Sequence, residues 1–335
     1  MSGAIRNIYE QEKTNRRLTI VVMGSFIVFV GLLGLGFDVF VLGFGSEYGG
    51  VLAQFPLATL LAVGVGLVSA FWSLESGSTS VLKSSGAVPV PATDPAYQQL
   101  RNVVEEIAIA AGLPVPAIYV IPDPDPNAFA TGKDPAHASI AVTQGLLDRL
   151  SRDELQGVIA HELSHIRNYD IRMMTVVAAL IGATMLLSEF GMRSMQFGGL
   201  RSSERRSRDS KDRGNGGSIL IIFWLIAMIL APIISKILAM AVSRQREYLA
   251  DASGAELTRN PLALASALGT IESAVEPTRS IKKGTAHLCI VDPLGAAMND
   301  KEGRTADLFA THPPIQKRIA ALRAMSYLST THPIQ

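Results

Sequence analysis

Four long apolar segments dominate the hydrophobic pattern of the chain. They cover residues 18–44, 51–72, 173–192 and 219–242. Each has about 20 residues or more, which is enough for a helix to cross the hydrocarbon core of a bilayer. The third and fourth segments could also be buried helices of a soluble domain, but the first two are too nearly free of charge for that alternative. The pattern therefore predicts a membrane protein that begins with two transmembrane helices.

Basic residues before the first apolar segment predict its orientation. Arg6, Lys13, Arg16 and Arg17 precede it, and the positive-inside rule keeps such residues in the cytoplasm. The apolar run is longer than that of a signal peptide and no cleavage site follows it, so we expect an uncleaved anchor. The link at 45–50 contains no lysine or arginine, so it can lie outside while the second helix returns the chain. A multi-pass protein of the plasma (inner) membrane with a cytoplasmic polar domain is expected.

Between the second and third apolar segments the pattern is that of a folded polar domain. Residues 76–86 are rich in serine and glycine and lead to two prolines, which predicts a linker. Helical apolar spacing follows at 97–111. Short β-like runs at 117–121 and 138–142 flank a proline-rich loop, and a short helix is expected at 144–150.

The HELSH pentapeptide carries the most informative chemistry of the chain. Ser151 and Glu154 precede it and match a capping box, so a helix should begin there. His161 and His165 then lie one turn apart on one face of that helix, where both imidazoles can bind one ion. Glu162 could take a proton from a water that zinc activates, as in metalloproteases. The alternative is a solvated helix face, but chance rarely gives this spacing among only six histidines.

A catalytic zinc site needs a third protein ligand. No histidine follows the pentapeptide closely enough to supply it, so the ligand must come from elsewhere. Glu247, just after the fourth apolar segment, is the best candidate, although an ordinary charged helix end explains this residue equally well. Asp251 lies one turn further and could accept a hydrogen bond from a ligating histidine. An antiparallel hairpin of the third and fourth apolar segments would bring both parts of the site to one membrane face.

Composition and charge narrow the class of protein. The chain is 48% hydrophobic and only 18% charged, with a net charge of +1, so nothing points to a nucleic-acid partner. Cys289 is the only cysteine, which excludes an intramolecular disulfide and favours a small buried side chain. The loop at 193–217 is basic. It would lie outside if both flanking segments span the membrane, against the positive-inside rule. Either the hairpin is re-entrant and stays on the inner side, or packing against the protease domain overrides the charge bias.

Four short blocks in order along nearly the whole chain carry a family resemblance. They are NAFATG at 127–132, HELSH with Asn168 and Asp170 after it, SRQREYLADA at 243–252, and Thr311-His312-Pro313-Pro314 with Arg318. Together they resemble the HtpX-like membrane zinc metalloproteases, relatives of the CAAX prenyl endopeptidases. The resemblance implies a mainly α membrane protein whose transmembrane helices accompany a zincin-type (gluzincin) α+β metalloprotease domain with a small edge sheet.

The resemblance also implies the metal site. His161, His165 and Glu247 would bind one Zn²⁺ ion per chain. Glu162 would be the general base, and Asp251 would orient a ligating histidine.

The resemblance implies a substrate site as well. Asn127, Ala128, Phe129 and Ala130 would form an edge strand beside the cleft, to which a substrate backbone adds as a further strand. His312 would stabilise the oxyanion of the tetrahedral intermediate. On pattern alone, His312 is a turn residue before a helix that begins at the following prolines.

The expected function is a zinc endopeptidase that cleaves membrane or misfolded proteins at the cytoplasmic face, in quality control or stress response. One alternative is a catalytically silent membrane scaffold or regulator that retains the fold. Another is a transporter or channel that uses Asp38 and Glu189 as intramembrane carboxylates. Both lie near the ends of apolar segments, however, so placement at the membrane interface is the simpler explanation. No pattern in the sequence specifies an oligomeric state.

The predicted organisation of the chain has five parts. They are a cytoplasmic N-terminus at 1–17, two transmembrane helices at 18–72, a first protease part at 73–172, a hydrophobic hairpin at 173–242, and a second protease part at 243–335.

Overall fold

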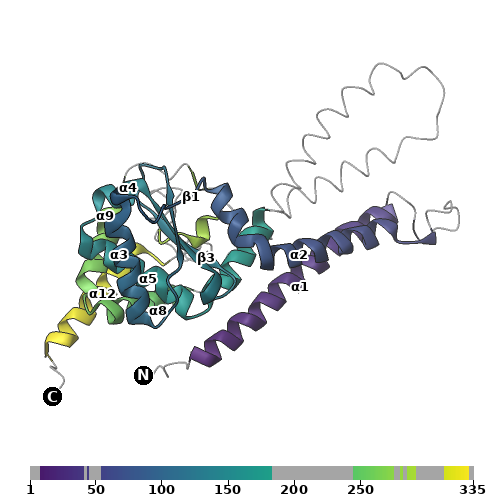
Figure 1. Ribbon diagram of the computed structural model, residues 1–335. Helices are drawn as coiled ribbons and strands as arrows, with labels where there is room; N and C mark the ends of the chain where they lie inside the picture. The colour runs from purple at the N-terminus through teal and green to yellow at the C-terminus, as the bar shows by residue number, and fades with distance from the viewer. Residues whose placement is uncertain are drawn as a thin grey trace, which may run out of the picture. The chain divides into compact units, whose positions relative to one another are not determined.

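The structure is a computed structural model of the chain (Figure 1). It describes residues 8–40, 44, 54–182, 244–274, 280–281, 285–291 and 313–331. The chain divides into two compact units. One unit comprises residues 1–19, 74–179 and 239–335, and the other comprises residues 20–73 and 180–238.

Two long helices begin the chain. Helix α1 runs over Ile8–Phe40 and helix α2 over Leu57–Ser84. Both are long and apolar enough to cross a bilayer, as the apolar pattern predicts. Many of their large apolar side chains are exposed in the isolated chain, and lipid is the surroundings in which such a surface is stable. Helix α1 begins ten residues before the predicted segment, because the polar residues ahead of residue 18 continue the same helix.

Small residues and one carboxylate hold the two helices together within their unit. A Cβ atom on Gly34 would lie 2.7 Å from the backbone oxygen of Ala58, so only glycine permits this approach. One turn further along α1, Asp38 accepts hydrogen bonds from the backbone N–H groups of Ala58 and Thr59, at 2.8 and 2.7 Å. It also accepts one from the Thr59 hydroxyl at 2.6 Å. Asp38 therefore caps the start of α2, which gives this buried carboxylate a structural role.

The predicted linker at 76–86 is wrong, because α2 continues to Ser84. One face of this extension is buried at Val81 and Leu82, and burial outweighs the weak helix propensity of serine and glycine. The turn after the helix reaches Gly86, whose φ of +67° is favourable for glycine. The following N–H, of Ala87, donates to the backbone oxygen of Leu82 at 3.0 Å.

A four-stranded mixed sheet lies in the larger unit. Its strands are β1 (Val88–Pro89), β2 (Ala117–Ile121), β3 (Ala128–Gly132) and β4 (Ala138–Thr143), in the order β1-β2-β4-β3. Strands β2 and β4 pair in parallel, and the other two pairs are antiparallel. The two strands expected from the apolar pattern are confirmed. The NAFATG block supplies β3 at one edge of the sheet, and the short β1 was not predicted.

Helices pack around this sheet over one apolar core. They are α3 (Gln98–Ala111), α4 (Gln144–Arg149), α5 (Arg152–Arg167), α8 (Arg244–Thr258), α9 (Pro261–Glu272) and α12 (Ile315–Thr331), with short 3₁₀ turns at Pro95–Tyr97, Pro135–His137 and Ala286–Leu288. The core joins apolar side chains of α3, β4, α5, α9 and α12. Figure 1 shows helices α3, α5, α9 and α12 gathered in one part of this unit. Helix α5 is central, because it packs against α3, α8, α9 and β3.

Two glycines bring neighbouring backbones unusually close to α5. A Cβ atom on Gly254 of α8 would lie 3.0 Å from the backbone nitrogen of His161. A Cβ atom on Gly157 of α5 would lie 2.9 Å from the backbone nitrogen of Leu264 in α9. Because neither glycine has a side chain, α8 and α9 can lie directly against the helix that carries the pentapeptide.

Candidate metal centre

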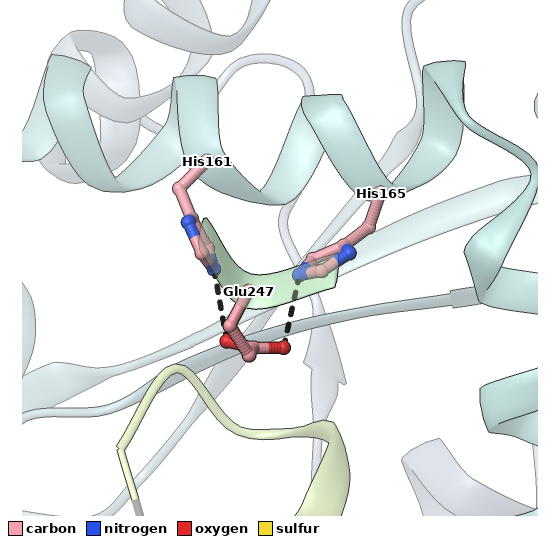
Figure 2. Close-up of side chains that lie close together, drawn as sticks. All are labelled: His161, His165 and Glu247. Carbon is pink, nitrogen blue, oxygen red and sulfur yellow. Dashed lines mark ion pairs between the residues drawn. The ribbon is translucent and has the colours of Figure 1, made fainter. Parts of the chain in front are cut away.

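Helices α5 and α8 together form a group of three potential metal ligands. Helix α5 begins with the predicted capping box, in which Ser151 and Glu154 exchange both hydrogen bonds. His161 and His165 leave α5 on the same side and point toward Glu247 of α8, as Figure 2 shows. The Nε2 atoms of His161 and His165 lie 3.7 and 3.6 Å from the two Glu247 carboxylate oxygens.

The spacing and burial of these atoms suit a single divalent ion. One ligand atom from each of the three residues lies within 4.8 Å of the others, and all three residues are buried. Tetrahedral zinc with bonds of about 2 Å holds neighbouring ligand atoms about 3.3 Å apart. Among the described residues the His161 Nε2 atom has no hydrogen-bond partner, and a buried polar atom is rarely left so. Two imidazoles and a carboxylate are one of the donor sets found in catalytic zinc sites.

Asp251 orients the first histidine from one turn further along α8. Its Oδ1 atom lies 2.9 Å from His161 Nδ1, so the other ring nitrogen can face the metal site. Arg318 of α12 is fully buried and donates to both Asp251 oxygens, at 2.8 Å from Nε and 2.7 Å from Nη2. Burial favours the neutral acid, but the charge and hydrogen bonds of Arg318 lower the pKa of Asp251 to about 2. The structure thus places the ionised Asp251 carboxylate against His161, and its role in orienting that ring remains a prediction.

Asp170 is the corresponding partner of the second histidine. Its Oδ2 atom lies 3.3 Å from His165 Nδ1, and the carboxylate is buried. Burial lowers the pKa of His165, but Asp170 and Glu247 raise it more strongly, to about 9. These carboxylates favour a cation, which can be a proton on the ring or a bound metal ion. Sequence reasoning assigned no role to Asp170 or Arg318, and their only signal was their place in the four blocks.

Glu162 adds a further buried carboxylate that is close enough to His165 and Glu247 for their charges to act on it. It is buried, and no described residue makes a well-aligned hydrogen bond to its oxygens. Burial, with the charge of Glu247, raises the pKa of Glu162 to about 7 against the opposing charge of His165. A carboxylate with a pKa near neutrality can both accept and return a proton at physiological pH.

The predicted substrate-binding residues lie at the start of the edge strand β3, with Asn127 directly before it. Asn127, Ala128, Phe129 and Ala130 are all buried. The Asn127 side chain donates to the backbone oxygen of Val291 at 3.1 Å, so it joins β3 to a neighbouring segment. His312 lies outside the described residues, as do the loop at 193–217 and the hairpin beyond residue 182.

Part of the outer edge of β3 is already paired. The backbone oxygen of Ala128 accepts from the Ile290 N–H at 3.0 Å, and the Gly132 N–H donates to the Thr175 hydroxyl at 3.1 Å. Alternation along a strand turns the backbone groups of Ala130 toward the same edge. Ala130 therefore lies between two occupied positions, and its backbone is close enough to Glu162 to favour the ionised carboxylate.

Two histidines, a glutamate and a buried acid beside them define a metallopeptidase site. Here that site belongs to a chain with two helices able to span a membrane. The chain belongs to peptidase family M48, which matches residues 96–326. This confirms the resemblance drawn from the four sequence blocks.

Relatives of this family cover nearly the whole chain. "Protease HtpX homolog" of Thermoanaerobacter pseudethanolicus is 44% identical over 322 residues, which is 96% of this chain and 99% of the relative. The protein of the same name from Caldanaerobacter subterraneus subsp. tengcongensis is 45% identical over 323 residues, 96% of this chain and 99% of the relative. A crystal structure of S. mikatae Ste24p matches with a TM-score of 0.47 and 19% identity, over 94% of this chain and 66% of that one.

Proposed function

We propose that this chain is a membrane-bound, zinc-dependent endopeptidase that cleaves membrane or misfolded proteins at the cytoplasmic face, in protein quality control. The observation that carries the proposal is the buried Glu162 carboxylate beside the convergent side chains of His161, His165 and Glu247. Membership of a peptidase family supports the reaction class.

The residues of the site would have separate roles in peptide hydrolysis. His161, His165 and Glu247 would hold zinc, which supplies a Lewis acid that makes water a better nucleophile near neutral pH. Glu162 accepts the proton of the attacking water and returns it to the leaving amine, for which its pKa of about 7 is suited. In the same proposal His312 stabilises the oxyanion.

A substrate backbone would bind along the outer edge of β3. Ala128 and Gly132 already bond through outward backbone groups, the Phe129–Cys289 bridge lies on the same edge, and the Ala130 N–H faces Glu162. The backbone oxygen of Ala130 is therefore the outward group that a substrate strand could bond beside Glu162. Backbone pairing of this kind selects extended segments rather than particular side chains. Locally unfolded proteins expose such segments, which supports a role in quality control.

The start of α1 supports a cytoplasmic site. Lys13, Arg16 and Arg17 are exposed near the beginning of this helix, and the positive-inside rule keeps them in the cytoplasm. Residues 1–19 belong to the same compact unit as the metal site. The site should therefore lie on the side of the membrane at which the chain begins.

The test compares wild type with Glu162→Gln, purified in detergent. Both proteins should contain about one zinc ion per chain by metal analysis, and only wild type should cleave casein. Glu162→Gln keeps the size of the side chain but cannot take up the proton, so we expect at least a 100-fold loss of rate. Bound zinc with equal cleavage, or with none, in both proteins would instead support the silent scaffold.

A further inference from the structure

The turn that follows α5 brings the Asp170 carboxylate next to the His165 ring. Helix α5 ends at Arg167, and Asn168 is its C-terminal cap. Tyr169 then adopts a φ of 59°, in the left-handed region that a residue with a Cβ atom rarely occupies. This reversal returns the chain so that the Asp170 carboxylate lies 3.3 Å from His165 Nδ1. Such a conformation persists only where surrounding contacts hold it.

A residue of the first helix holds both ends of this turn. The Asn15 side-chain nitrogen donates to the backbone oxygen of Asn168 at 3.0 Å and to Asp170 Oδ1 at 2.7 Å. Both partners can only accept, so this orientation of the amide group is the one that satisfies them. Asn15 is itself buried, although it lies 153 and 155 residues from its partners along the chain.

The two carboxylate oxygens of Asp170 contact different residues. Oδ1 receives the amide of Asn15, with Arg246 Nη1 at 3.7 Å, and Oδ2 faces the ring of His165. With Oδ1 held in this way, the carboxylate cannot rotate Oδ2 away from the ring without breaking a short buried hydrogen bond. The amide of Asn15 is uncharged, so this bond does not itself neutralise the negative charge of Asp170.

We propose that Asn15, in the membrane-anchoring helix α1, is a positioning residue of the metal centre that acts through Asp170 on His165. The proposal rests on the proposed function, since it concerns the same metal site. It makes the first helix a part of the site as well as an anchor. A purely structural role, in which Asn15 only joins α1 to the rest of its unit, is the alternative that the experiment must separate.

The experiment measures zinc affinity on the full-length protein in detergent, by competition with a fluorescent zinc chelator. Asn15→Asp keeps the size of the side chain but places an acceptor where two hydrogen bonds are donated. Asn15→Ala removes the side chain, and alanine has the higher helix propensity, so α1 itself is not weakened. The matched control is Asn102→Ala, an exposed asparagine in the interior of α3. Each Asn15 variant should bind zinc at least about tenfold more weakly than wild type, the usual effect of losing such a supporting contact, while the control should be unchanged.

A double-mutant cycle with Asp170→Asn separates positioning from general stability. If Asn15 acts through Asp170, Asn15→Ala should weaken zinc binding less than about twofold in the Asp170→Asn background. The proposal would be overturned if the Asn15 variants bound zinc as tightly as the Asn102→Ala control. It would also be overturned if Asn15→Ala still weakened zinc binding tenfold in the Asp170→Asn background. Wild type that binds no zinc would overturn the proposed function and this inference with it. Wild type that binds zinc no better than Asn15→Asp and Asn15→Ala would overturn the inference alone.

Discussion

The close approach of α8 to α5 at Gly254 makes the sharpest prediction. In Gly254→Ala the new Cβ atom would lie 3.0 Å from the backbone nitrogen of His161 and 3.2 Å from its Cα atom. Comfortable contacts of this kind are about 3.5 Å or longer, so the two helices must separate by about half an ångström. Because both neighbouring atoms belong to the backbone of α5, no side chain can turn aside to relieve the contact.

That separation acts directly on the metal site. His161 and His165 belong to α5 and Glu247 to α8, so their 3.6–3.7 Å spacing widens as the helices part. A metal site tolerates deviations of only about 0.2 Å in its metal–ligand distances. We therefore expect zinc affinity to fall about 10-fold to 100-fold. Overpacking costs about 1–3 kcal/mol, and the higher helix propensity of alanine offsets about 1 kcal/mol of this. The metal-free protein should therefore lose at most about 2 kcal/mol of stability.

The control for this prediction is Gly269→Ala in α9. A Cβ atom at Gly269 would meet nothing within 4 Å, so this variant should gain about 0.5–1 kcal/mol and keep wild-type zinc affinity. Chelator competition measures the affinity, and thermal melting with and without zinc measures the stability. If Gly254→Ala matched Gly269→Ala in both measurements, the argument that glycine sets the spacing of the metal ligands would be refuted.

Three further predictions concern buried charges. Arg318→Met removes the cationic partner of the buried Asp251 carboxylate and should cost about 3–5 kcal/mol, with Arg318→Lys between it and wild type, as measured by melting of the metal-free protein. The folded-state pKa of Asp251 is about 2, below its ordinary value of 3.8, so its stabilisation of about 2 kcal/mol is present above pH 4 and lost as the pH falls toward 2. The free-energy difference between metal-free wild type and Asp251→Asn should therefore shrink over that range, and a constant difference would contradict it. Asp38→Ala removes the cap of α2 and should cost about 1 kcal/mol in a detergent melt, whereas Asp38→Asn, which still accepts hydrogen bonds, should cost less.

Local patterns in the sequence were sufficient for the elements that carry the pentapeptide. The capping box at Ser151 and Glu154 and the four-residue spacing of His161 and His165 depend only on the geometry of one helix. The same holds for the apolar runs that became β2 and β4 and for the length of the first two apolar segments. The prediction of a linker at 76–86 was wrong because the structure there depends on tertiary packing and not on local pattern alone. Serine and glycine lower local helix propensity, but burial of one helix face against distant residues outweighs it.

The sequence by itself therefore determined the class of chemistry, two histidines on one helical face with a glutamate between them, and an anchor of two apolar helices. Only the tertiary structure decided which distant groups complete and orient the site. Glu247 reaches the histidines because Gly254 lets α8 touch α5, Arg318 pairs with Asp251 from another helix, and Asn15 meets Asp170 across a left-handed turn at Tyr169. Helical periodicity is set by bonds between near neighbours. The meeting of residues far apart in the chain depends instead on the packing of the whole unit, which no local pattern encodes.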